Sequence, residues 1–191
     1  MRKKPPSVDP KHHTIFERGD RMSWQNPDEL LDHVKIQSDW TAADVGCGRG
    51  FFTIPLASQV KFVFAIDMKP EKLEELKATM EEFQLKNVEP LLGGKNEIPL
   101  PDERVDLLIS ANTLHEFADK VRMVTEMRRV LKRNGIVMIS DFRKKETGFG
   151  PSISRRLSKQ EVIALFERQG FLTMYTHPLR YHYLLVFTKS G

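Results

Sequence analysis

Short apolar segments alternate with longer amphipathic segments along most of this chain. Residues 70–85 and 119–132 carry apolar side chains at the three-to-four-residue spacing of a helix with one buried face. Between such segments lie short runs rich in β-branched and aromatic residues, which predict buried strands. Strands that alternate with helices indicate a parallel sheet covered on both faces. The predicted strands are 42–45, 62–67, 88–92, 105–110, 136–141, 171–177 and 182–188.

Capping residues mark several of the predicted helix ends. Asn26 can cap a first helix, and Ser158 with Glu161 has the spacing of a capping box. Gly135 follows the second amphipathic segment and is expected to end that helix as its C-terminal cap. Another helix is expected to begin near Thr113.

The last two predicted strands are joined by only a few residues around "PLRY". Such a connection is too short for the crossover that parallel strands need, so this pair should be antiparallel. The sequence therefore predicts an α/β fold with a doubly wound sheet of seven strands, mostly parallel, ending in an antiparallel hairpin. We expect one domain over residues 26–191, preceded by an N-terminal arm or cap over residues 1–25.

Composition limits the class of protein. Of the 191 residues, 40% are hydrophobic and 29% are charged, which is an ordinary globular profile. No apolar run approaches the roughly 18–20 residues of a membrane helix, and the basic N-terminus lacks the apolar core of a secretory signal. The single cysteine, Cys47, excludes an internal disulfide framework and favours a cytoplasmic location. No His or Cys pair has metal-ligand spacing, so no metal is expected.

The net charge of +4 raises the possibility of a nucleic-acid partner. The excess is modest, however, and it is spread over clusters at residues 2–4, 128–133 and 143–156. A solvated basic surface is the favoured interpretation, and we do not expect nucleic acid to be the partner.

The stretch "ADVGCGRGFF" places Gly46, Gly48 and Gly50 just beyond Asp44, with Val45 between. Glycine costs about 0.5–1 kcal/mol relative to alanine inside regular structure, so a backbone requirement must explain the cluster. In open α/β sheets ligands bind beyond the carboxyl ends of the strands, where the strand order reverses. The turn is not the G-x-G-x-x-G pattern of dinucleotide sites, because the third glycine would have to replace Phe51.

Two acids at predicted strand ends suggest the ligand. Asp44 beside the turn suits a ligand that carries an ammonium group. Asp67 ends the second strand, where acids accept hydrogen bonds from ribose hydroxyls in nucleotide-binding sheets. The structural alternative is a turn of glycines with a strand-end acid that caps the next helix.

Four segments, taken in order, carry a family resemblance. They are "DVGCGRG", "FAIDMKPEKLEELK", "IPLPDERVDLLISANTLHEF" and "EMRRVLKRNGIVMISDF". Over about residues 26–188 the chain resembles class I S-adenosylmethionine-dependent methyltransferases, of the small-molecule branch that includes ubiquinone/menaquinone-type enzymes. The resemblance implies a Rossmann-like fold, S-adenosyl-L-methionine as cofactor, and methyl transfer to a small organic acceptor.

The resemblance also implies where the cofactor lies. The glycines would line its methionine and ribose portions, Asp44 would hold the amino-acid end, Asp67 the ribose hydroxyls, and Met68 would pack on adenine. The family often has an acid facing the adenine amine where this chain has Gly94, so backbone near that residue or the Asn96 side chain would read adenine. The residues after the fourth strand would lie beside the methyl group. The implied cofactor-binding residues are Asp44, Gly46, Cys47, Gly48, Gly50, Asp67, Met68, Gly94, Lys95, Asn96, Ala111 and Asn112.

His115, in "NTLHEF", is the best placed candidate for a general base, the alternative being a histidine that packs or caps the adjacent helix. His182 and Tyr183 could reach the same rim or form a structural pair. The fourth-strand motif lacks the Asn/Asp-Pro-Pro-aromatic pattern of nucleic-acid amine methyltransferases. No second cysteine is present for cytosine chemistry.

Acceptor recognition is expected from the N-terminal arm, through Phe16, Met22 and Trp24, and from the connector that follows the fifth strand. Between Phe142 and Arg156 this connector holds five cations and one acid. It could be a lid that favours an anionic acceptor, or a solvated loop. Two further functions stay open: an RNA or protein methyltransferase, and a non-catalytic cofactor-binding scaffold.

Overall fold

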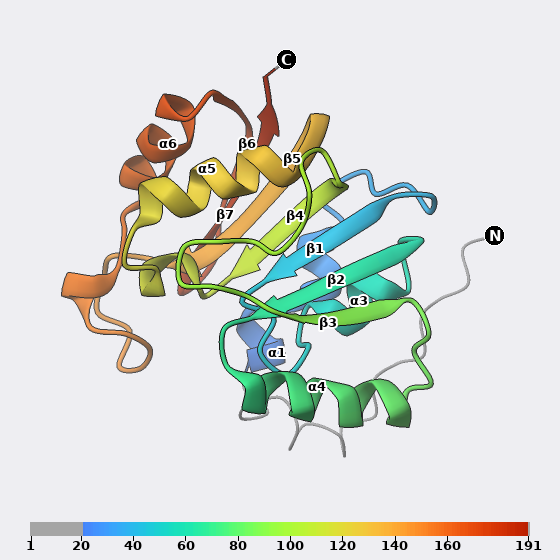
Figure 1. The fold of residues 1–191 in the computed structure, drawn as a ribbon. Coiled ribbons are helices and arrows are strands. Elements are labelled where there is room, and N and C mark those ends of the chain that lie inside the picture. Colours follow the sequence, from blue (N-terminus) through green and yellow to red (C-terminus); the bar gives the residue numbers. More distant parts are fainter. Residues whose placement is uncertain (1–20, 191) are drawn as a thin grey trace.

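The structure is a computed structural model that describes residues 21–190. Seven strands form one sheet in the order β3-β2-β1-β4-β5-β7-β6 (Figure 1). The first five pair in parallel, while β7 runs antiparallel to both β5 and β6. This architecture confirms the predicted fold and its C-terminal hairpin. The strands are β1 (Thr41–Val45), β2 (Phe62–Asp67), β3 (Val88–Leu92), β4 (Val105–Ala111), β5 (Leu131–Phe142), β6 (Phe171–Pro178) and β7 (His182–Lys189).

Helices cover both faces of the sheet, as predicted (Figure 1). Apolar residues of α2, α3 and α4 pack on one face, and those of α5 and α6 pack on the other. The helices are α1 (Arg21–Trp24), α2 (Pro27–Leu31), α3 (Thr53–Ala57), α4 (Pro70–Glu82), α5 (Lys120–Val130) and α6 (Lys159–Arg168), with 3₁₀ turns η2 (Leu114–Glu116) and η3 (Ile153–Arg155). None of the helices in the described part of the chain has the length and hydropathy to cross a membrane.

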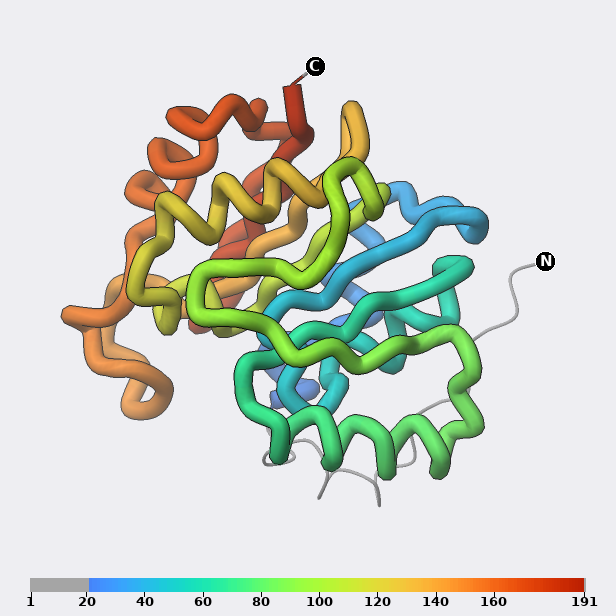
Figure 2. Tube along the Cα trace, viewed as in Figure 1, coloured from blue at the N-terminus to red at the C-terminus, as the bar shows by residue number. Residues whose placement is uncertain are grey.

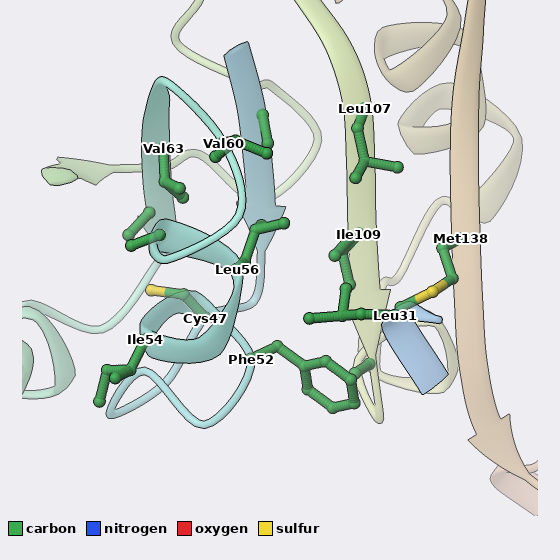
Figure 3. Packing of buried hydrophobic residues seen from close by; sticks show 14 of the residues in the cluster. Leu31, Cys47, Phe52, Ile54, Leu56, Val60, Val63, Leu107, Ile109 and Met138 are labelled. Atoms are coloured by element: carbon green, nitrogen blue, oxygen red, sulfur yellow. The ribbon is translucent and has the colours of Figure 1, made fainter. Parts of the chain in front are cut away.

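Alternation along the strands builds two separate cores. Leu107 and Ile109 of β4 face α2 and α3, whereas Leu108 between them faces α5. Figure 3 shows the first core, where Leu31 and Phe52 close over Ile109 and Met138. Because the central strands β1, β2 and β4 are buried on both sides, they can present polar groups to a ligand only at their ends. The carboxyl ends of the parallel strands are therefore where functional side chains can gather.

The end of α5 differs from the prediction. The helix does not continue to a cap at Gly135 but stops at Val130, and β5 begins at Leu131. Leu131 is fully buried and pairs with Val105 of β4, so it must take an extended conformation. The "RNG" residues then form an irregularity inside β5. A side chain on Gly135 would lie 2.9 Å from both Leu131 and the Lys132 carbonyl, which explains the glycine.

Other predicted helix boundaries agree closely with the structure. Ser158 and Glu161 form the predicted capping box: the Glu161 amide donates to the Ser158 hydroxyl at 3.2 Å, and the Ser158 amide donates to the Glu161 carboxylate at 2.7 Å. Asn26 caps α2 by accepting a hydrogen bond from the Asp28 amide. The helix expected near Thr113 is the single 3₁₀ turn η2. The connector between β5 and α6 projects beyond the sheet as a separate loop (Figure 2).

Candidate active site

A cleft of about 1020 Å³ opens at the carboxyl ends of the parallel strands. It lies where the strand order reverses between β1 and β4, the position at which open α/β sheets bind ligands. Every cofactor-binding residue implied by the sequence lines this cleft except Gly50 and Asn96, and His115 lines it as well. Trp24 of the predicted acceptor region also reaches the cleft, whereas Phe16 lies outside the described residues.

The three glycines of the β1 turn have three different roles. Gly46 has a φ of +79°, and a side chain there would lie 2.3 Å from Thr113, so this glycine lets the β1 turn meet the segment after β4. Gly48 has a φ of +54°, and among residues 21–190 nothing lies within 4 Å of where its side chain would project. Gly50 has a φ of +93° and allows close packing on Leu76 of α4, away from the cleft.

Cys47 lies between the first two of these glycines and is buried. Burial raises the pKa of its thiol, with the nearby carboxylates adding to the effect. The thiol is therefore protonated and a poor nucleophile, in keeping with the absence of cysteine chemistry expected from the sequence.

Asp67 is fixed across the mouth of the β1 turn. One carboxylate oxygen accepts a hydrogen bond from the Gly48 amide at 2.9 Å, and the other accepts from the Lys69 amide at 2.9 Å. Each oxygen keeps a further lone pair that can accept from a ligand. The carboxylate is thus preorganised for a pair of hydroxyl donors at the end of β2.

Asp44 is buried beneath the same turn. The hydroxyl of Thr53 donates to its carboxylate at 2.6 Å. Burial raises the pKa of Asp44 to about 6, and the hydrogen bond from Thr53 opposes that rise. Thr53 did not emerge from the sequence analysis, although it is the one polar side chain in the apolar segment "FFTIPLA".

An acid reaches the cleft from the loop after β3, although Gly94 itself supplies none. The Gly94 amide donates to the Glu97 carbonyl at 3.2 Å, and this turn places Glu97 on the cleft wall. Lys95 and Met68 line the cleft near the same loop, and Met68 is 50% exposed. The sequence analysis missed Glu97, because its position depends on how tightly "GGKNE" turns.

Asn112 does not face the cleft as a free amide. Its side chain exchanges two hydrogen bonds with Gln25, of 2.9 and 3.2 Å, and Gln25 also donates to Ser140 of β5 at 2.9 Å. Gln25 is only 1% exposed. It anchors the segment that carries α1 over the ends of β4 and β5.

His115 is paired with an acid that the sequence analysis did not single out. Its Nδ1 lies 2.7 Å from a carboxylate oxygen of Asp141, and its backbone amide donates to the other oxygen at 3.1 Å. The Phe142 amide also donates to this carboxylate, at 2.7 Å. Because the carboxylate accepts a hydrogen bond from Nδ1–H, Nε2 is the nitrogen that keeps a lone pair. The signal in the sequence is that Asp141 is one of the last two residues of its strand, as Asp44 and Asp67 are of theirs.

Three aromatic side chains, Trp24, Phe142 and Phe149, line the cleft beside His115, and we call them the aromatic wall. Their ring centroids lie 5.4 to 6.3 Å apart. The Phe142 ring is 6.3 Å from that of His115 in an edge-on arrangement. The wall combines residues from α1, β5 and the connector.

The basic connector is organised by one of its own cations. Arg156 is buried, and its guanidinium donates five hydrogen bonds to oxygen atoms of residues 143–151. Lys144 forms an ion pair with Glu161. Arg155 is the connector cation that lines the cleft. Three of the five cations in the connector thus have distinct places: Arg156 is structural, Lys144 is paired, and Arg155 faces the cleft.

His182 and Tyr183 do not line the cleft and are buried behind it. The His182 ring stacks on Trp24 at a centroid distance of 4.9 Å and an angle of 7°. Among residues 21–190, neither ring nitrogen of His182 has a hydrogen-bond partner. Burial lowers the pKa of His182 to about 3, and the charges of Arg21 and Arg156 contribute.

Comparison with known proteins gives consistent results. A family model described as "Methyltransferase domain" matches residues 36–177. A probable S-adenosylmethionine-dependent methyltransferase of Mycobacterium tuberculosis is 28% identical over 141 residues, which cover 69% of this chain and 50% of that protein. This chain thus spans about half the length of that relative.

Solved structures match over nearly the whole chain. A crystal structure of a SAM-dependent methyltransferase from Aquifex aeolicus has a TM-score of 0.86 and 28% identity, and the match covers 96% of this chain and 100% of that one. The [4+2]-cyclase SpnF shares the fold with a TM-score of 0.78 at 17% identity, over 86% of this chain and 79% of its own. The resemblance predicted from the four sequence motifs is confirmed: the chain belongs to the methyltransferase domain family and has the fold of class I S-adenosylmethionine-dependent methyltransferases.

Proposed function

We propose that the protein transfers the methyl group of S-adenosylmethionine to a small organic acceptor held beside His115. The observation that carries this proposal is the layout of one cleft. The glycine turn and the fixed Asp67 carboxylate form one part of it, and the His115–Asp141 pair with the aromatic wall forms another. A cofactor site and an acceptor site thus share the switch point of the sheet.

The residues of the cleft fit the cofactor. Asp67 offers two oriented oxygens to the ribose hydroxyls, and the open space above Gly48 leaves room for a ligand against the backbone. Asp44 supplies negative charge for the ammonium group of the methionine portion. Glu97 is the acid available to the adenine amine, in place of one at Gly94.

Methyl transfer depends more on the alignment of the acceptor with the methyl group than on a strong acid or base. S-adenosylmethionine, when bound, supplies a methyl group that its sulfonium charge already activates. The protein's main task is then to align the acceptor, and effective molarities of about 10⁵ M or more show how much alignment can contribute. His115 accepts the acceptor's proton at Nε2, because Asp141 holds the ring with its Nδ1 proton turned inward. Asp141 acts through His115 and is a positioning residue.

Two alternatives have less support. An RNA or protein methyltransferase would use the basic clusters to bind its substrate. Arg129 of the 128–133 cluster, however, forms ion pairs with Glu126 and Asp102 and does not line the cleft. A scaffold that has lost turnover would not need an oriented His–Asp pair at the cleft. The fold alone does not decide, since SpnF shares it and is named a cyclase. The ubiquinone/menaquinone-type branch and a cytoplasmic location stay predictions.

Calorimetric titration with S-adenosylmethionine and S-adenosylhomocysteine tests the proposal. The wild type should bind both, and Asp67→Ala should bind at least tenfold more weakly. Glu89→Ala is the matched control, because Glu89 is an exposed acid on the neighbouring strand β3 and does not line the cleft. Absence of binding by the wild type, or equal losses in both variants, would contradict the proposed cofactor site.

A further inference from the structure

We infer that the acceptor is a flat, conjugated hydroxy compound without positive charge, a phenol or an enol, with its ring on the aromatic wall and its hydroxyl at Nε2 of His115. This inference rests on the proposed function and names the substrate class of the same site. Three features carry it: the shape of the wall, the charge around it, and the hydrogen-bonding state of His115.

The wall offers ring surfaces in place of polar anchors. Trp24 and Phe149 are tilted by 43° at 5.4 Å, and Phe142 and Phe149 meet edge-on at 5.9 Å. One face of Trp24 is stacked on His182, and Phe142 is only 7% exposed. The ring surface open to a further aromatic ring is therefore that of Phe149, which is 38% exposed, together with the part of Trp24 that lines the cleft. Tyr181 supports the wall from behind, 4.9 Å from Phe149. A conjugated, planar acceptor makes the best use of this surface.

The charge near the wall disfavours a cationic acceptor. Aromatic cages hold ammonium ligands by presenting free ring faces, but the Arg156 guanidinium already lies 5.1 Å over the Phe142 ring. Arg21 and Arg155 add positive charge to the same part of the cleft. Asp141 is buried behind His115 and is engaged by it and by two backbone amides, whereas Glu116 lines the cleft and is about half exposed. The other acids of the cleft, Asp44, Asp67 and Glu97, belong to the proposed cofactor site.

The state of His115 selects the nucleophile. With Nδ1 held by Asp141, the ring can only accept a proton at Nε2, so the acceptor must bring one. Phenolic hydroxyls have a pKa of about 10, so a histidine can accept their proton in the transition state. Ordinary hydroxyls are much weaker acids, as the pKa of water, about 15.7, illustrates. A neutral amine would become a cation during the reaction, next to Arg156.

The step balances without any other reactant. The acceptor oxygen forms a bond to the methyl carbon as the carbon–sulfur bond breaks, and the electron pair of that bond goes to sulfur. The hydroxyl proton moves to Nε2 of His115. The products are a methyl ether, S-adenosylhomocysteine and a protonated His115 that returns its proton to solvent.

A binding experiment separates this inference from the proposed function. In a Trp40→Phe background Trp24 is the single tryptophan, because the chain has two. Its fluorescence then reports ligands on the wall in the presence of saturating S-adenosylhomocysteine. The probes are phenol, anisole, which has the ring without the proton, and phenyltrimethylammonium, which has the ring with a positive charge. We expect phenol to bind at least tenfold more tightly than the cation.

Turnover with a phenol panel and radiolabelled S-adenosylmethionine gives the second readout. His115→Asn keeps a donor toward Asp141 and removes Nε2, so turnover should fall about 10²–10⁴-fold, a clearly larger factor than the weakening of phenol binding that follows from the lost hydrogen bond. Asp141→Asn should lower turnover and change its pH profile, which a purely structural role would not do.

The outcomes are distinct. Tighter binding of phenyltrimethylammonium than of phenol, or binding of S-adenosylhomocysteine without any phenol binding, overturns the acceptor class and leaves the proposed function intact. Turnover of His115→Asn equal to that of the wild type overturns the role of Nε2. Failure to bind S-adenosylhomocysteine at all overturns the proposed function itself.

Discussion

The side chains of Gln25 and Asn112 hydrogen-bond to each other twice, across 87 positions of the sequence. Gln25 therefore joins the segment before α2 to the end of β4, and its bond to Ser140 extends the link to β5. Trp24, the preceding residue, is held on the cleft by the same anchor. The position of the aromatic wall thus depends on a buried amide that has no part in the reaction.

Replacing Gln25 with alanine should loosen this anchor. The Asn112 amide and the Ser140 hydroxyl would lose their partner in a buried setting, which costs roughly 1–3 kcal/mol of unfolding free energy. We expect the KM for the acceptor to rise severalfold and the Kd for S-adenosylhomocysteine to change less than twofold, because Asp67 and the glycine turn are untouched. Chemical denaturation and calorimetry measure the two effects.

Glu29→Ala is the control for this variant, since Glu29 is exposed and its side-chain hydrogen bond within the described part of the chain is the one it accepts from Asn26. A Gln25→Ala protein that binds acceptor as the wild type does would show that Trp24 is positioned by other contacts.

Asp44→Asn should stabilise the protein without ligand. The pKa of Asp44 rises from 3.8 in the unfolded chain to about 6 in the fold, so folding takes up a proton and ionisation opposes it. Ionised Asp44 lowers the free energy of unfolding. This loss is absent below pH 4, grows through pH 4–6 and is complete above pH 6, where it amounts to roughly 1–3 kcal/mol. Asparagine can still accept from Thr53 and carries no charge.

Thermal denaturation of both proteins at pH 4.5 and pH 7.5 checks this expectation. The variant should be more stable at pH 7.5, and the difference should shrink at pH 4.5. It should also bind S-adenosylmethionine more weakly at pH 7.5, because the ammonium group loses its counter-charge. A variant that is less stable than the wild type at pH 7.5 would mean that Asp44 is ionised without cost in the fold.

Gly46→Ala should mainly lower the stability of the protein, whereas Gly48→Ala should mainly weaken cofactor binding. At Gly46 the new methyl group would lie 2.3 Å from Thr113 on a backbone with φ of +79°, so we expect a loss of about 2–4 kcal/mol in unfolding free energy. At Gly48 the space is open, and only the strain of a left-handed residue applies, about 1–2 kcal/mol. There the methyl group should instead obstruct the cofactor and weaken its binding at least tenfold.

Denaturant titration and calorimetry on both variants separate these effects. Equal destabilisation by the two substitutions would contradict the different surroundings of the two glycines.

Residues that a local motif fixes could be predicted from the sequence. Asp44, Gly46 and Asp67 follow from strand ends and a turn, and the structure places all three on the cleft. Asp141 was missed because its partner His115 lies 26 positions away. Gln25 was missed because Asn112 and Ser140 lie 87 and 115 positions away. Only the strand order brings these residues together. The helix end before Leu131 was predicted wrongly for the same reason: burial of a leucine against β4 outweighed the local signal of a glycine cap.

Arg156→Lys should open the connector. A lysine ammonium is a compact point charge and cannot reproduce the five hydrogen bonds that the planar guanidinium distributes over residues 143–151. We expect faster chymotrypsin cleavage at Phe149 and a higher KM for the acceptor, with an unchanged Kd for S-adenosylhomocysteine. Arg168→Lys on the exposed side of α6 is the matched control. Cleavage at the wild-type rate would show that the charge of Arg156, and not its hydrogen bonds, orders the connector.

His182→Phe should make the protein more resistant to acid. The pKa of His182 falls from 6.5 in the unfolded chain to about 3 in the fold, so unfolding takes up a proton between these values. Above pH 6.5 His182 is neutral in both states and its protonation does not affect the free energy of unfolding. As the pH falls from 6.5 toward 3, only the unfolded chain takes up the proton, so the free energy of unfolding decreases. Phenylalanine removes this loss and keeps a ring against Trp24 and Phe142.

At pH 7.5 the same variant should gain roughly 1 kcal/mol, because two buried ring nitrogens without partners among residues 21–190 are replaced by carbon. Urea denaturation at pH 7.5 and pH 4.5 measures both effects, and the advantage of the variant should widen at the lower pH. That direction is opposite to the one expected for Asp44→Asn, whose advantage fades in acid, so the pair of variants separates the two buried groups. An advantage of His182→Phe that stays constant with pH would show that His182 takes up a proton as readily in the folded protein as in the unfolded chain.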